Sequence, residues 1–169
     1  MPYKKINDEV YYAEGSIVEF SAKDYVFLKE AAARNPRQRS RLCVHPGTDA
    51  PIHEMFIVHH HGAYVRPHKQ LAKNESLQIL EGEADVLLFD EAGKLLRIIE
   101  LGDMASGKTF FYRMEHQDFH TLRIHSPIVF IKEVTAGPFL LKNTIFAPWS
   151  PDEKDTAGVV KFLEQIRTM

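Results

Sequence analysis

The chain has 169 residues, of which 44% are hydrophobic and 26% are charged, a balance typical of one globular domain. Its formal net charge of −2 provides no bulk positive field that would attract nucleic acid or an anionic membrane surface. No apolar run is long enough to span a bilayer, and the first residues lack the apolar segment of a secretory signal. The lone cysteine, Cys43, excludes an intrachain disulfide, so we expect a cytoplasmic protein.

One helix is expected near each end of the chain. Ser21 and Asp24 have the spacing of a capping box at the start of a helix over about 21–35, which Asn35-Pro36 would end. Apolar residues at helical spacing predict a second helix over about 156–167, with Asp155 or Thr156 as its cap.

Between these helices the pattern predicts short strands separated by turn signals. The segments rich in β-branched and aromatic residues are RLCV, IHEMFIVH, AYVRPH, ESLQILEG, ADVLLFD, KLLRIIEL, FHTLRIH and IVFIKEVT. Because the helices lie at the ends and do not alternate with strands, a sandwich or barrel is favoured over a parallel βαβ fold. We expect a single domain over 1–169, with its barrel over about 40–150.

The strongest chemical signal lies between Gly62 and Gly82, in the segment GAYVRPHKQLAKNESLQILEG. Residues two apart in a strand point to one face, so His68 and Gln70 share a face. The chain then turns and returns as a neighbouring strand from Glu75, which places a carboxylate opposite these two side chains. His120, in the segment DFHTL of a later strand, is the best candidate to complete the set.

Two histidines and one carboxylate form the facial triad associated with non-haem iron(II), and the set also suits zinc, manganese or nickel. We therefore predict one divalent transition metal held by His68, Gln70, Glu75 and His120. The alternative is that the histidines are ordinary polar residues at strand ends.

The same spacing, Gly62-x5-His68-x-Gln70-x4-Glu75-x6-Gly82, resembles the first cupin motif, with Gln70 where a second histidine usually stands. Flanking segments resemble the WbuC family of cupin-fold metalloproteins: NPRQRSRLCVHP, YVRPHK, VLLFDEAGK, FHTL, EVTAGPF and TIFAPWSP. The resemblance covers about residues 35–151. It implies an all-β cupin fold, a double-stranded β-helix or jelly-roll barrel, with a short N-terminal helix and a C-terminal helix. Members are often encoded with genes of surface-polysaccharide (O-antigen or capsule) biosynthesis.

Two departures from the family pattern bear on the metal. A carboxamide at Gln70 is a weaker ligand than imidazole, and the usual proline and glycine before the last histidine are replaced by Glu115 and Gln117. His120 itself is retained.

The resemblance implies a context of surface-polysaccharide biosynthesis, so the leading interpretation is a metal-dependent cupin that acts on a sugar or sugar nucleotide. Isomerase- or epimerase-type chemistry is one option, and the interpretation leaves open whether the protein is an enzyme. Two alternatives are a non-enzymatic module that binds a metal or small ligand, and an iron(II)-dependent oxygenase. The partner would be a small molecule, with neither nucleic acid nor membrane, and sheet edges that need covering predict a homodimer.

Further side chains are candidates for binding and proton transfer. Arg37 and Arg39 alternate with Arg41 on one face of an extended segment, where they could bind an anion bidentately or form a solvated edge. Strand parity with His68 predicts that Arg66 and Tyr64 face the same cavity, Arg66 to bind substrate and Tyr64 or Glu75 to move a proton. The alternative is that Arg66 and Tyr64 pack at the mouth of the barrel.

Other features are interpreted as structural. The run His59-His60-His61 is expected to be a partly exposed strand end, and His116 an exposed turn residue or, alternatively, a substitute for Gln70. The segment GDMASGKT (102–109) matches the phosphate-binding P-loop pattern, with Lys108 and Thr109 at its key positions. A P-loop needs a following helix, and the aromatic residues after Thr109 lack a helical stripe, so we expect a coincidental match.

Overall fold

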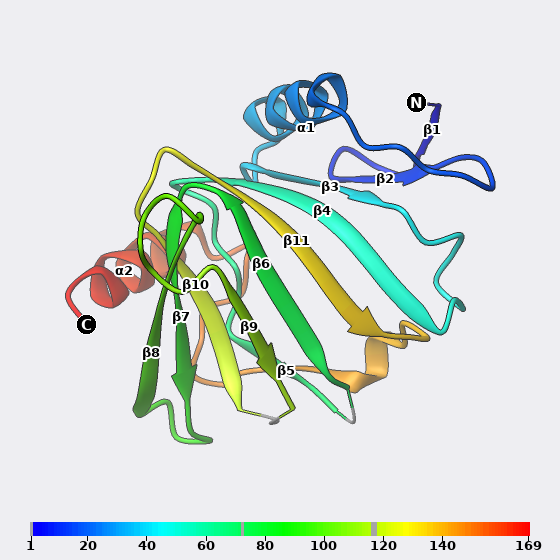
Figure 1. Ribbon diagram of the computed structural model, residues 1–169. Helices are drawn as coiled ribbons and strands as arrows, with labels where there is room; N and C mark the ends of the chain where they lie inside the picture. The colour runs from blue at the N-terminus through cyan, green and yellow to red at the C-terminus, as the bar shows by residue number, and fades with distance from the viewer. Residues whose placement is uncertain (1, 72, 116–117) are drawn as a thin grey trace.

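The structure is a computed structural model that describes residues 2–71, 73–115 and 118–169. Within these residues the strands form two sheets that face one another (Figure 1). The larger sheet has the order β1-β2-β3-β4-β11-β6-β9, and the smaller has the order β12-β5-β10-β7-β8. All pairings are antiparallel except that of β2 with β3.

The elements have the following bounds. The strands of the larger sheet are β1 (Tyr3–Lys5), β2 (Val10–Ala13), β3 (Arg39–Cys43), β4 (Ile52–His60), β6 (Glu75–Glu81), β9 (Phe111–Met114) and β11 (Ile128–Ala136). Those of the smaller sheet are β5 (His68–Gln70), β7 (Glu83–Phe89), β8 (Leu95–Gly102), β10 (Phe119–Ile124) and β12 (Thr144–Phe146). The helices are α1 (Ala22–Arg34) and α2 (Thr156–Arg167), with a short 3-10 helix, η1, at Leu141–Asn143.

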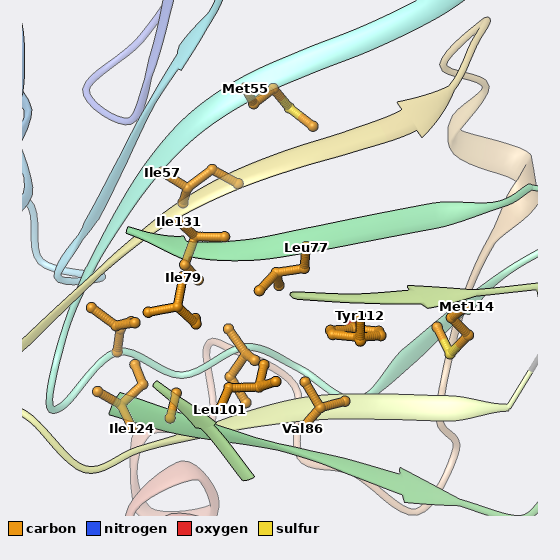
Figure 2. Close-up of a cluster of buried hydrophobic side chains, with 14 of the residues drawn as sticks. Met55, Ile57, Leu77, Ile79, Val86, Leu101, Tyr112, Met114, Ile124 and Ile131 are labelled. Carbon is orange, nitrogen blue, oxygen red and sulfur yellow. The ribbon is translucent and has the colours of Figure 1, made fainter. Parts of the chain in front are cut away.

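The main apolar core lies between the two sheets (Figure 2). Alternate residues of each strand point inward, so Ile57, Ile131 and Ile79 lie side by side across β4, β11 and β6. Val86, Leu101 and Ile124 of the smaller sheet belong to the same cluster. Other inward-facing residues of the two sheets are polar, such as His68, Glu75 and His120, and they line a cavity.

Each helix covers the outer surface of one sheet. The backbone N–H of Ser21 donates to Asp24 Oδ2 over 2.8 Å at the start of α1, which packs on β3 and β4 through Leu28 and Ala32. In α2, the side chain of Asp155 accepts from the N–H of Gly158 over 2.9 Å. The all-β fold with a short N-terminal and a C-terminal helix is thus confirmed.

Some local expectations were wrong. Residues 63–67 of AYVRPH are not in a strand, and only His68–Gln70 pair, because Pro67 lacks an N–H and restricts the residue before it. The strand that begins at Glu75 does not neighbour β5 but lies in the facing sheet. Strands β1, β2, β9 and β12 were not expected.

Candidate metal centre

A cavity of about 380 Å³ opens between the two sheets, a volume within the range of small-molecule sites. Both sheets contribute polar side chains to its lining. The charged, imidazole and amide residues among them are Glu9, Arg37, Arg39, Arg41, His59, Arg66, His68, Gln70, Glu75, His120, Glu133 and Glu153. All four side chains predicted from the motif spacing to hold a metal therefore lie in one cavity.

His68 and His120 are direct partners across β5 and β10, with ring centroids 4.6 Å apart. Their Nδ1 atoms lie 2.9 Å from the carbonyl of Arg66 and 3.2 Å from that of Asp118, respectively. A carbonyl only accepts, so each Nδ1 carries the hydrogen and each Nε2 keeps its lone pair. Burial lowers the pKa of both rings, that of His68 to about 4, so both are neutral near pH 7. Neutral imidazole with a free Nε2 is the form that binds metals.

Glu75 extends from β6 toward the same histidines and is 9% exposed. Its Oε1 lies 3.8 Å from His120 Nε2 and accepts a hydrogen bond from the Tyr112 hydroxyl at 3.4 Å. Two atoms bound to one zinc ion at about 2.1 Å each are at most about 4.2 Å apart, so this pair could share an ion. Burial raises the pKa of Glu75 to about 7, against the opposing effect of the Tyr112 hydrogen bond.

Gln70 also lines this cavity. Its Oε1 is buried and has no hydrogen-bond partner among the described residues. An unsatisfied buried acceptor is costly, and a cation would satisfy it. As the side chains stand, however, no three His, Cys, Asp or Glu residues of the described chain are arranged to hold a metal. The donor chemistry fits a metal, whereas closing the set on one ion requires side-chain movement.

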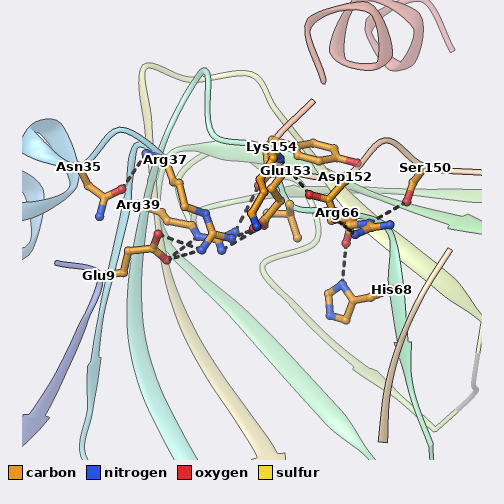
Figure 3. Close-up of polar contacts among 12 residues, drawn as sticks. Glu9, Asn35, Arg37, Arg39, Arg66, His68, Ser150, Asp152, Glu153 and Lys154 are labelled. Carbon is orange, nitrogen blue, oxygen red and sulfur yellow. Dashed lines mark hydrogen bonds and ion pairs between the residues drawn. The ribbon is translucent and has the colours of Figure 1, made fainter. Parts of the chain in front are cut away.

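The predicted arginines line the cavity but are already paired (Figure 3). Arg37 and Arg39 each form ion pairs with Glu9 and Glu153. Arg66 pairs with Asp152 at 2.6 Å and its guanidinium lies 4.8 Å from the ring centre of Phe146.

Tyr64 is not among the residues that line the cavity. Its hydroxyl donates to the carbonyl of Pro151 over 3.0 Å, and its ring packs edge-on against Phe162 of α2. Burial raises its pKa to about 12, and its placement gives the predicted proton transfer no support.

Sequence reasoning missed two of the titratable residues that come from the sheets and line the cavity, His59 and Glu133. His59 was interpreted as part of a partly exposed strand end, but it is 7% exposed, and burial with the nearby Arg41 and Arg37 lowers its pKa to about 3. Glu133, on β11, has its pKa raised to about 8 by burial and by Glu75, with Arg41 opposing. The signal available was the inward parity that Glu133 shares with Val129 and Ile131, since a charged residue at an apolar position marks a site.

The P-loop match is coincidental, as expected. No helix follows Thr109, which instead bridges to Leu101 and leads into β9. The Lys108 ammonium pairs with Glu83 at 2.6 Å. The alternative ligand His116 lies outside the described residues.

Comparison with known proteins supports the fold. A family model described as a domain of unknown function, DUF6016, matches residues 20–101, and no curated protein matches the sequence. The chain is similar to oxalate oxidase in complex with the substrate analogue glycolate (14% identity, TM-score 0.51, 79% of this chain and 74% of that one). It is similar to protein SO0799 from Shewanella oneidensis (12% identity, TM-score 0.51, 73% of this chain and 76% of that one). It is also similar to the capsular polysaccharide assembling protein CapF from Staphylococcus aureus (12% identity, TM-score 0.54, 66% of this chain and 32% of that one).

The chain has the cupin fold. At these identities the likeness shows the fold alone, and the chain spans about a third of CapF. The narrower resemblance to WbuC proteins remains a prediction. Among the described residues, no helix is long and apolar enough to cross a membrane.

Proposed function

We propose that this cupin binds one divalent transition metal through His68, Gln70, Glu75 and His120 and acts on a sugar or sugar nucleotide. The observation that supports it best is the pair of neutral imidazoles whose Nε2 atoms form no hydrogen bond among the described residues. The orphaned oxygen of Gln70 in the same cavity adds to it.

A bound metal would supply Lewis acidity toward a carbonyl or hydroxyl oxygen of the substrate. The chain's own residues would do the rest. The carbonyls of Arg66 and Asp118 fix both imidazole rings through Nδ1. Glu75, the carboxyl beside His120, would also accept and return a proton of the substrate. Apolar side chains such as Leu122 and Ile131 also line the cavity and would limit the access of water to the substrate.

The polysaccharide context belongs to this proposal and is supported by two likenesses. One is the resemblance of the sequence segments to WbuC proteins, and the other is the shared fold with a protein described as assembling capsular polysaccharide. A cytoplasmic location and a homodimer are part of the same proposal. The strand β9 lies at the edge of the larger sheet, and Phe111 on it is 49% exposed, which supports a second copy covering that edge.

Elemental analysis of untagged protein tests the metal. We expect about one metal per chain in the wild type and loss of it in both His68→Ala and His120→Ala. The matched control is His61→Ala, because His61 is exposed and does not line the cavity. No metal in the wild type after exposure to iron, zinc, manganese and nickel would overturn the proposal.

The second candidate is a cupin that binds a small ligand without metal or turnover. It is favoured by the side-chain arrangement, in which the described residues form no closed set of three ligands, and by the amide at position 70. Ligand binding that persists in His68→Ala, together with absent metal, would support this candidate over the first.

A further inference from the structure

Three of the four arginines that line the cavity have their charges compensated. The guanidiniums of Arg37 and Arg39 face the carboxylates of Glu9 and Glu153, two positive charges against two negative ones (Figure 3). Arg39 Nε lies 3.0 Å from Glu9 Oε2, and Arg66 has its own partner in Asp152. We call the part of the cavity lined by Arg37, Arg39 and Arg66 its mouth. Because these three guanidiniums are paired, the mouth offers little uncompensated positive charge to a ligand.

Arg41 differs from these three. It lies on β3 opposite Ile57 of β4, two residues after Arg39 along the strand, and it lines the cavity. Within the described part of the chain, its half-buried guanidinium has neither a hydrogen bond nor an ion pair. Arg41 acts on Glu133 only as a nearby charge. A guanidinium carries five N–H donors, and a half-buried one without acceptors is expected to meet a ligand.

A second polar group beside Arg41 also lacks a partner. His59, opposite Arg39 on β4, is 7% exposed, lines the cavity, and its Nδ1 has no hydrogen-bond partner among the described residues. The rest of the nearby lining is apolar and includes Ile57, Ile131 and Leu122. An unpaired cation next to an unsatisfied imidazole, with apolar walls, is complementary to one anionic group on an otherwise compact molecule.

We propose that Arg41 binds the carboxylate of a small sugar acid, with His59 completing the contact. This rests on the proposed function and specifies its substrate class. A planar carboxylate matches the two parallel N–H groups of a guanidinium. Arg41 supplies one uncompensated positive charge, which balances a carboxylate monoanion but not a phosphate dianion. The pyrophosphate of a sugar nucleotide would need free cations at the mouth, where Arg37 and Arg39 are already paired.

The test compares D-glucuronate with D-glucose and with glucose 1-phosphate by calorimetry, on metal-free and zinc-loaded protein. We expect glucuronate to bind at least about tenfold more tightly than either of the others, as the gain of a charged hydrogen bond implies. Arg41→Gln should abolish that preference, and Arg41→Lys, which keeps the charge but not the fork, should retain part of it. The matched control is Arg97→Gln, because Arg97 is exposed on β8 and does not line the cavity.

Several outcomes would overturn this assignment: equal binding of glucuronate and glucose, tighter binding of glucose 1-phosphate, no binding of glucuronate at millimolar concentration, or unchanged binding in Arg41→Gln. Thermal melting shows whether each variant is folded, and Arg41→Lys serves if Arg41→Gln is not. The metal proposal is judged separately from zinc content. If no metal binds but glucuronate still binds through Arg41, the metal proposal fails and the carboxylate site stands.

Discussion

Raising the pH from about 6 to about 8 changes the charge of one proposed metal ligand, because the pKa of Glu75 is about 7. A metal binds the ionised carboxylate, of which about one tenth is present at about pH 6 and about nine tenths at about pH 8. The affinity for zinc should therefore rise about tenfold over this interval. His68, with a pKa of about 4, is neutral throughout and contributes nothing to the change.

The assay is competition between the protein and a chelator of known zinc affinity at both pH values. Glu75→Gln should bind zinc more weakly and should lose the pH dependence. Repeating the measurement in Glu133→Gln removes the second carboxyl of the cavity, whose pKa is also raised. If Glu75→Gln keeps the tenfold rise, a histidine is the titrating group, and the assignment of neutral, buried imidazoles is refuted.

Three further predictions concern stability. Asp85→Asn should lower the free energy of unfolding in urea by about 3 kcal/mol, because the buried Asp85 carboxylate pairs with Arg123, whereas the exposed Glu164→Gln should have no effect. Gly82→Ala should cost at least about 1 kcal/mol, because φ there is +87° and a Cβ would meet the carbonyl of Ile128; Gly107→Ala, with φ of +74° and open space, should cost less. Glu133→Gln should become progressively more stable than the wild type between about pH 5 and about pH 8, as measured by thermal melting. In the folded wild type the pKa of Glu133 is raised to about 8, whereas in the unfolded chain the same carboxyl ionises near its ordinary pKa of 4.5. The wild type therefore loses stability as the pH rises from the unfolded pKa to the folded one.

The motif spacing was enough to predict that the four proposed ligands lie in one cavity. Strand alternation determines the face on which His68, Gln70 and His120 lie, and this requires only local geometry. The error in placing Glu75 on a neighbouring strand had no effect on the set, because a facing sheet also brings its carboxylate to the histidines.

The remaining cavity residues depend on long-range register, which the sequence does not contain locally. His59 lies in the cavity because β4 pairs with β3 and β11 in one particular register, and Arg39 is neutralised by Glu9 and Glu153 from distant segments. Arg41 was grouped with Arg37 and Arg39, and only the ion pairs in space distinguish them: within the described ranges, Arg37 and Arg39 have carboxylate partners and Arg41 has none.

The mouth of the cavity is held by charges from opposite ends of the chain, since Glu9 precedes β2 and Glu153 precedes α2. Dissolved salt screens charges over about 8 Å at physiological ionic strength, and exposed pairs are weakened most. Added salt should loosen the contacts of Arg37, which is 40% exposed, more than the attraction of the deeper Arg41 for an anion. Entry of a charged ligand would then be fastest at an intermediate salt concentration, high enough to loosen the mouth and low enough to preserve the attraction within.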